Sequence, residues 1–150
     1  MSDYTFSHRG GCECGGVRFQ YLTDTPLTEL PVRSCQCEFC RPRAALYSSE
    51  PSASLHIEVK DRRILYAHRF GTRSADFMHC ARCNNLVYVR CDIAGKQYAI
   101  VVVSALAGEL PDWQATAMDY EGESLQQRLS RRAECWIHNF ELAEIDHAAQ

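Results

Sequence analysis

Seven of the nine cysteines in this chain fall into three short clusters. They are the pair Cys12 and Cys14, the triplet Cys35, Cys37 and Cys40, and the pair Cys80 and Cys83. Cysteines this close in sequence rarely meet the Cα separation and dihedral angle of a disulfide without straining the backbone. They can converge on one metal ion, because tetrahedral zinc holds each thiolate about 2.3 Å from its centre. The clusters therefore predict a fold organised by bound metal rather than by disulfides.

The number of thiols in each cluster predicts two metal sites of different kinds. The two pairs together supply four thiolates, which close a tetrahedral structural site. The triplet supplies three thiolates and leaves one coordination position for water or a substrate sulfur. We therefore expect two zinc ions per chain, one structural ion on Cys12, Cys14, Cys80 and Cys83, and one ion at a candidate catalytic site on Cys35, Cys37 and Cys40.

The residues around the two pairs suit a metal site. Cys12 and Cys14 are two positions apart, so in an extended segment their side chains project toward the same side. Two glycines on either side of this pair allow the backbone to approach an ion closely. Asn84 and Asn85 follow Cys83 and tolerate a left-handed φ, as in a zinc knuckle. The alternative is that these four thiols are reduced and carry no metal.

The triplet favours chemistry with thiols. Three thiolates on a divalent ion leave about one net negative charge, so the zinc would be a mild Lewis acid. A thiol bound in the fourth position would still lose its proton to the metal. Such a site suits thiol binding and transfer better than peptide hydrolysis. Arg41 and Arg43 follow the triplet and either offset its charge, clamp a substrate carboxylate or are solvated.

The alternative for the triplet is a second structural zinc with a fourth ligand from elsewhere in the chain. The candidates are His68, His79, Cys91 and His138. Unless it is a ligand, we expect Cys91 to be a small core residue, and we expect the same of Cys135. Lone cysteines among apolar residues are usually buried for this reason.

Composition narrows the class of protein. A chain of 150 residues with 46% hydrophobic and 23% charged residues fits one globular domain, here residues 1–150. A formal net charge of −3 gives no general attraction to nucleic acid or to anionic membranes. The polar start of the chain shows no secretory signal, and its longest apolar run is too short to cross a bilayer. An odd number of cysteines with CxxC spacing favours a reducing compartment, so we expect a cytoplasmic location.

The apolar pattern predicts strands with one late helix. The helix is expected over 122–133, with Leu125 and Leu129 on one apolar face and Arg128, Arg131 and Arg132 on a solvated face. The segment 111–119 is irregular. Together these patterns predict a mainly antiparallel β domain with the cysteine clusters on its turns. The expected strands are 17–21, 44–48, 55–59, 64–66, 76–79, 86–89, 97–104 and 135–140.

Three stretches carry a resemblance to a known family. They are Gly11-Cys12-Glu13-Cys14-Gly15-Gly16-Val17-Arg18-Phe19, Cys35-Gln36-Cys37-Glu38-Phe39-Cys40-Arg41 and Phe77-Met78-His79-Cys80-Ala81-Arg82-Cys83. In order and spacing, over about residues 10 to 104, they resemble the glutathione-dependent formaldehyde-activating enzyme (GFA) family, also called the centromere-protein-V type. The resemblance implies an Mss4-like fold of antiparallel β-sheets with zinc knuckles and two zinc sites. It assigns the structural ion to the two pairs and the second ion to the triplet.

The chain departs from this family at several positions. The family usually has histidine at the position of Gln36, a glycine–alanine pair near Ala44 and Ala45, and glycine at the position of Asn84. Residues 105–140 do not look typical of it. We therefore expect a shared metal scaffold and a different substrate pocket.

Two functions are compatible with these features. The first, implied by the resemblance, is a zinc-dependent carbon–sulfur lyase or synthase, similar to S-hydroxymethylglutathione synthase. It would join a glutathione-like thiol to an aldehyde at the triplet. The second is a non-catalytic zinc module that binds a protein or nucleic acid. The sequence shows no basic tail or basic face, so we expect no nucleic-acid partner. The open coordination position favours the enzyme, and the oligomeric state is not predicted.

Overall fold

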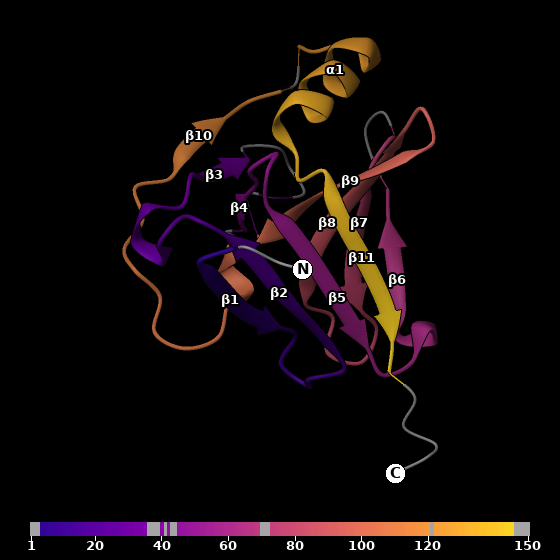
Figure 1. Cartoon of the computed structure of the whole chain (residues 1–150). Coiled ribbons are helices and arrows are strands. Elements are labelled where there is room, and N and C mark those ends of the chain that lie inside the picture. Colours follow the sequence, from indigo (N-terminus) through magenta and orange to yellow (C-terminus); the bar gives the residue numbers. More distant parts are fainter. Residues whose placement is uncertain are drawn as a thin grey trace.

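The computed structural model describes residues 4–35, 40, 42, 45–69, 73–120 and 122–145. This part of the chain is mainly β, with one α-helix, as the sequence predicts (Figure 1). The strands are β1 Phe6–Gly11, β2 Val17–Thr23, β3 Val32–Cys35, β4 Leu46–Ser48, β5 Ser54–Val59, β6 Leu65–His68, β7 Asp76–Cys80, β8 Leu86–Ile93, β9 Lys96–Val102, β10 Thr116–Met118 and β11 Asn139–Glu144. The helices are α1 Leu125–Cys135 and the short 3-10 turns η1 Leu27–Glu29, η3 Arg62–Ile64 and η4 Val103–Ala105.

The strands form two sheets. One has the order β1-β2-β5-β11, and the other has the order β10-β3-β4-β9-β8-β7-β6. Most neighbours are antiparallel, which confirms the expected class. Two edge strands differ, because β11 runs parallel to β5 and β10 runs parallel to β3. Figure 1 shows β5 and β11 in front of β7 and β8, with α1 at one end of the molecule.

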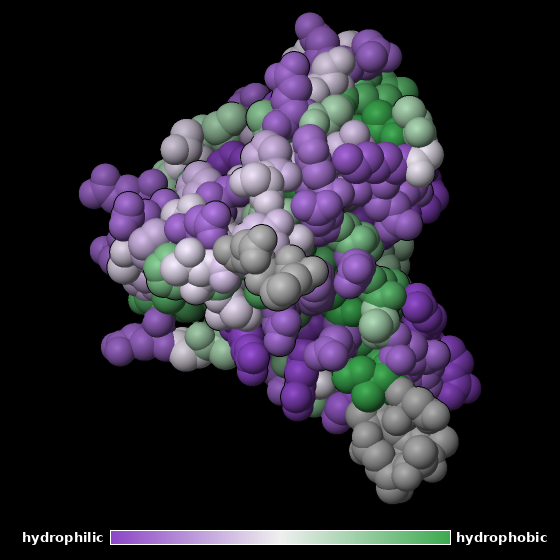
Figure 2. Space-filling model, in the orientation of Figure 1, coloured by the Kyte–Doolittle hydropathy of each residue, from purple (hydrophilic) through white to green (hydrophobic). Residues whose placement is uncertain are grey.

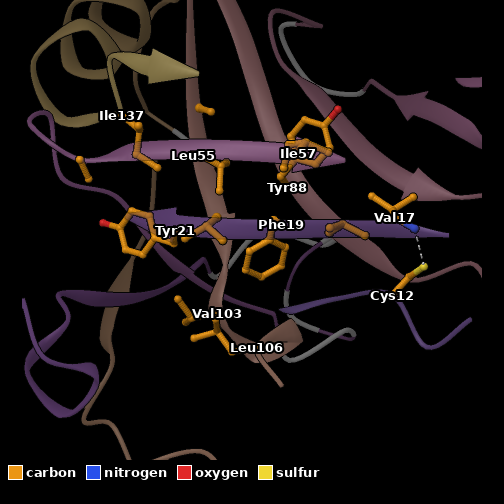
Figure 3. Close-up of a cluster of buried hydrophobic side chains, with 14 of the residues drawn as sticks. Cys12, Val17, Phe19, Tyr21, Leu55, Ile57, Tyr88, Val103, Leu106 and Ile137 are labelled. Carbon is orange, nitrogen blue, oxygen red and sulfur yellow. Dashed lines mark hydrogen bonds between the residues drawn. The ribbon is translucent and has the colours of Figure 1, made fainter. Parts of the chain in front are cut away.

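The main core lies between the two sheets. Strand β2 alternates between buried and more exposed residues, so Val17, Phe19 and Tyr21 all point inward. Leu55 and Ile57 of β5 continue this layer, and each is at most 1% exposed. Figure 3 shows these side chains gathered with those from the seven-stranded sheet and its following turn. Those partners are Tyr88, Val103 and Leu106, and Ile137 joins them from the segment between α1 and β11.

A second apolar cluster lies on the other face of the seven-stranded sheet. Neighbouring residues on a strand point to opposite faces, so Val101 joins the main core whereas Val102 joins the second cluster. Trp136 and Leu129 pack against this second cluster, so α1 and the residue after it cover the outer face of the sheet. The cluster also contains Cys40 and Cys91, which confirms the expected burial of Cys91.

Helix α1 differs in detail from the sequence prediction. It begins after Ser124, whose side chain accepts from the backbone N–H of Gln127 while the Gln127 side chain accepts from the Ser124 N–H. This capping box satisfies N–H groups that lack helical partners and fixes the start of the helix. Cys135 is the last helical residue and is exposed, so the prediction of a core cysteine was wrong. The strand predicted over 135–140 is present as β11, but it begins later, at Asn139. Leu125 is 48% exposed and does not contribute to a buried face.

The basic side of α1 is only partly solvated. Arg131 forms an ion pair with Glu123, as expected of a helix surface. Arg132 is only 6% exposed, so the prediction of a solvated side chain was wrong for this residue. Its Nη1 donates to Ser74 and lies 3.5 Å from the Cys91 sulfur, and its guanidinium lies near the Trp136 ring. Arg132 therefore anchors the helix to the sheet.

The surface is polar on the side seen in Figure 1. Figure 2 shows this face as largely hydrophilic, with apolar side chains in small separate patches. Within the described residues, no helix is both long enough and apolar enough to span a membrane.

Candidate functional site

Four cysteine sulfurs converge at one end of the two sheets. Within the described residues, the Sγ atoms of Cys12, Cys14, Cys80 and Cys83 all lie within 4.8 Å of one another. The Cys14 sulfur lies 3.5 Å from those of Cys12 and Cys80. Thiolates around a tetrahedral zinc are separated by about 3.8 Å when each lies about 2.3 Å from the ion. The four side chains therefore fit a zinc ion, and the predicted grouping of the two pairs is confirmed as a candidate metal centre.

The first pair lies on the turn between β1 and β2. The backbone N–H of Gly15 donates to the Cys12 carbonyl, and Gly15 has the left-handed φ of 76° that this tight turn requires. The N–H of Val17 donates to the Cys12 sulfur at 3.3 Å. A Cβ on Gly16 would lie 2.6 Å from Ile64 Cδ1, so only glycine fits at this position without displacing that side chain. The turn thus fixes one half of the centre.

The second pair lies at the hairpin between β7 and β8. Asn84 takes a left-handed φ of 61°, and its N–H donates to the Cys80 carbonyl at 2.7 Å. The side-chain oxygen of Asn85 accepts from the N–H of Glu13 at 2.8 Å and from the Cys83 thiol at 3.2 Å. Asn85 therefore connects the two halves of the centre, and both asparagines play the turn roles expected of a zinc knuckle.

The four thiols have different affinities for protons in the metal-free centre. Burial raises the pKa of Cys12, and it raises the pKa of Cys80 to about 12. Burial acts in the same direction at Cys83, but donors from the backbone of Cys14 and Asn85 and from neighbouring thiols outweigh it and lower that pKa to about 7. A metal ion would bind all four as thiolates, and its binding would therefore release protons.

The triplet is only partly described. Cys35 ends β3 and is half-buried, whereas Cys40 is 2% exposed and its sulfur lies 3.0 Å from the Tyr47 hydroxyl oxygen. Cys37 lies outside the described residues, as do Arg41 and Arg43. Both described thiols belong to the outer face of the seven-stranded sheet, away from the four-thiol centre. The three-thiol metal site therefore stays a prediction.

The candidates for a fourth ligand of the triplet have other contacts. His79 Nδ1 donates to the Phe77 carbonyl at 2.8 Å, and the His79 ring stacks on Tyr66. His138 Nε2 donates to the Ala133 carbonyl at 2.8 Å. Cys91 contacts Arg132. None of these contacts identifies a fourth ligand, so that assignment also stays a prediction.

A cleft of about 820 Å³ adjoins the four-thiol centre. It runs between the turn that carries Cys12 and the segment that follows β9. Its polar lining includes the exposed side chains of Arg9, Arg18 and Ser104, and its apolar lining includes Ala45. Ala45 belongs to the same apolar cluster as Cys40, so the cleft extends from the metal centre toward the triplet. A small polar molecule would fit in this space.

A family model with the description glutathione-dependent formaldehyde-activating enzyme matches residues 7–123. The chain belongs to this family. The match spans both cysteine pairs, the triplet and the cleft, whereas α1 and β11 lie beyond it. A solved crystal structure of a Rhodobacter sphaeroides protein is similar to this GFA chain with a TM-score of 0.51 and 24% sequence identity. The similarity covers 73% of this chain and 99% of the other, and it supports the fold.

Spacing and family motifs could predict the cysteines, but not the other residues of the site. Asn85 could be expected on a turn, but its contact with Glu13 joins segments 72 residues apart in the sequence. The cleft arises where β1, β4 and η4 meet, and no local pattern signals that meeting. The burial of Arg132 had no sequence signal either, because it results from tertiary packing of α1.

Proposed function

We propose that this GFA protein is a zinc-dependent carbon–sulfur lyase or synthase that acts on adducts of a small thiol and an aldehyde. One observation carries the proposal. The four-thiol centre closes without the triplet, so Cys35 and Cys40 are thiols that the structural site does not need. The cleft beside the four-thiol centre is lined in part by Ala45 and Val102, which belong to the same apolar cluster as Cys40. The family description names a glutathione-dependent reaction with formaldehyde.

The cleft suits a glutathione-like molecule. Arg9 and Arg18 present guanidinium groups on its wall, and such groups bind carboxylates with two parallel hydrogen bonds. Ala45 and Val102 supply apolar surface near the triplet. A thiol with carboxylates could therefore place its charged end on the arginines and its sulfur toward Cys35 and Cys40.

The proposed step needs a thiolate and a positioned aldehyde. A zinc ion held by Cys35, Cys37 and Cys40 would supply the thiolate by lowering the pKa of a bound substrate thiol. The substrate thiol gives its proton to water, its sulfur attacks the carbonyl carbon, and a carbon–sulfur bond forms. The π electron pair moves to the oxygen, which takes a proton back from water, so that no proton is gained or lost overall. The reverse step breaks the same bond. The residues of the cleft contribute by holding both reactants together, which removes much of the entropic cost.

The proposed chemistry requires reduced thiols. No cysteine in the described part of the chain forms a disulfide, which is compatible with the reducing conditions of the cytoplasm that we propose as its location. A small thiol such as glutathione is abundant under those conditions, and it would be the partner of this protein.

Calorimetric titration of the zinc-loaded protein with glutathione tests the proposal. We expect saturable heat at millimolar glutathione or below, and we expect Cys35→Ala to abolish it while the fold is retained. Cys135→Ala is the matched control, because Cys135 is an exposed thiol at the end of α1. If glutathione and other small thiols give no heat at millimolar concentration, the lyase proposal is wrong.

A further inference from the structure

Arg33 lies on the same face of the sheet as the described thiols of the triplet. It is two positions before Cys35 on β3, so both side chains project to one face with Cα atoms about 6.6 Å apart. Arg33 also pairs with Tyr47 across β3 and β4, and directly paired residues share a face. Because the Tyr47 hydroxyl contacts the Cys40 sulfur, Arg33 lies beside both ends of the triplet.

The guanidinium of Arg33 is positioned but not neutralised. Its Nη2 donates to Ser49 Oγ at 2.8 Å, and Ser49 in turn donates to the Cys135 carbonyl at 2.9 Å. Ser49 is 5% exposed, so this hydroxyl is a fixed anchor. Among the described residues, no carboxylate forms an ion pair with Arg33, although the side chain is half-buried. A fixed, half-buried guanidinium with remaining N–H donors favours a carboxylate from outside the chain.

Tyr120 and α1 form a wall next to this arginine. Met118 of β10 pairs with Cys35, so Tyr120 follows at the end of β3 where the triplet begins. The Arg131 guanidinium stacks on the Tyr120 ring at 3.6 Å, and Glu123 holds Arg131 in place with 2.9–3.2 Å contacts. Burial raises the pKa of Tyr120, while the charges of Arg33 and Arg131 oppose that rise and Cys35 adds to it. Arg33, Cys35 and Tyr120 are therefore neighbours.

We propose that Arg33 binds a carboxylate of the thiol substrate and so selects thiols that carry an acid group near the sulfur. This inference rests on the proposed function, because it assumes that the substrate sulfur lies at Cys35 and Cys40. Glu123 forms its ion pair with Arg131. Arg33 can therefore bind a carboxylate of the substrate. Tyr120 and Arg131 belong to the wall that confines the acid group. Tyr120 lies within the residues that the family model matches, whereas Arg131 of α1 lies beyond them.

Binding measurements with two small thiols, one with a carboxylate and one without, distinguish the role of the acid group from that of the sulfur. The zinc-loaded protein is titrated calorimetrically with 3-mercaptopropionate, which has a carboxylate, and with 2-mercaptoethanol, which has none. We expect Arg33→Ala to weaken 3-mercaptopropionate binding about 10- to 100-fold, the range for a lost hydrogen bond to a charged group. Binding of 2-mercaptoethanol should not change. Arg33→Gln keeps a donor for Ser49 without the charge, so it should show the same selective loss even if the alanine variant folds poorly.

The outcomes distinguish this inference from the proposed function. Arg63→Ala is the matched control, because Arg63 is exposed and already pairs with Asp61 at 2.7 Å. If both thiols bind the parent protein and Arg33→Gln leaves their affinity ratio unchanged, the role of Arg33 is wrong while the thiol site stands. An equal loss of affinity for both thiols also overturns the carboxylate role. If the parent protein binds neither thiol, the proposed function and this inference both fail.

Discussion

The side chain of Asn85 joins the two halves of the four-thiol centre. Its side-chain oxygen accepts from the Glu13 backbone on one hairpin and from the Cys83 thiol on its own hairpin. The Val17 N–H adds a further donor to the Cys12 sulfur. These contacts hold the four sulfurs close together without a metal ion. A bound metal would therefore complete an arrangement that the chain already favours. We still expect a bound metal to contribute much of the stability of the fold.

Cys83→Ala should prevent stable folding. A structural zinc contributes about 10–16 kcal/mol in small zinc domains at neutral pH, which is comparable to the whole stability of an ordinary domain. Losing one of four thiolates removes most of that contribution. We expect the variant to lose bound zinc and its cooperative thermal transition, measured by circular dichroism. Cys135→Ala removes an exposed thiol and should melt like the parent protein. A cooperative transition in Cys83→Ala at the parent temperature would contradict the structural role.

At the scale of elements, α1 depends on a charge pair as well as on its cap. The carboxylate of Glu123 receives three contacts from Arg131, and these hold its pKa below the ordinary value of 4.5, although burial opposes the change. A depressed carboxyl pKa stabilises the folded state above the ordinary value, and that contribution is lost as the pH falls through the folded-state pKa. The docking of α1 should therefore weaken in acid.

Glu123→Gln tests this pH dependence. Its urea midpoint should lie below that of the parent protein at about pH 7, with a difference of about 1 kcal/mol or less in unfolding free energy. The difference between the two midpoints should shrink as the pH falls through the folded-state pKa of Glu123, because the parent carboxylate then becomes protonated. Glu134→Gln changes an exposed residue on the same helix and serves as the control. A difference that persists unchanged in acid would show that the pair does not carry the effect.

The strands differ in how well the sequence could predict them. Strands β2 and β5 alternate cleanly between apolar and polar residues, because one face of each packs on the core, and both were predicted. Strand β11 has only Phe140 and Leu142 partly buried, and β10 has three residues, so neither gives a strong local pattern. Their parallel pairing also depends on partners far away in the sequence. The position of Tyr120 beside Cys35 follows from that pairing, and it could not be predicted for the same reason.

For the whole molecule, the two sheets separate stability from the candidate chemistry. The main core lies between the sheets, and the four-thiol centre joins the two at one end. The described thiols of the triplet, Cys35 and Cys40, lie on the outer face of the seven-stranded sheet, against which Trp136 and Leu129 also pack. A change at the triplet should therefore leave the main core intact, whereas a change between the sheets should destabilise the whole domain.

Leu55→Ala should destabilise the whole domain, because Leu55 lies between the sheets. Leu55 is 0% exposed between the sheets, and truncation of such a leucine leaves a cavity that costs about 2–5 kcal/mol. Leu125 is 48% exposed at the start of α1, so Leu125→Ala should cost about 0.5 kcal/mol or less. Urea unfolding followed by tryptophan fluorescence measures both. Equal losses in the two variants would mean that the main core is not where the structure places it.

The zinc content of the purified protein tests the central claim most directly. We predict two zinc ions per chain, measured by mass spectrometry of the metal after gel filtration. In Cys37→Ala we predict one ion, with an unchanged circular dichroism spectrum and melting temperature. One tightly held ion in the parent protein that Cys37→Ala does not affect would contradict the second site.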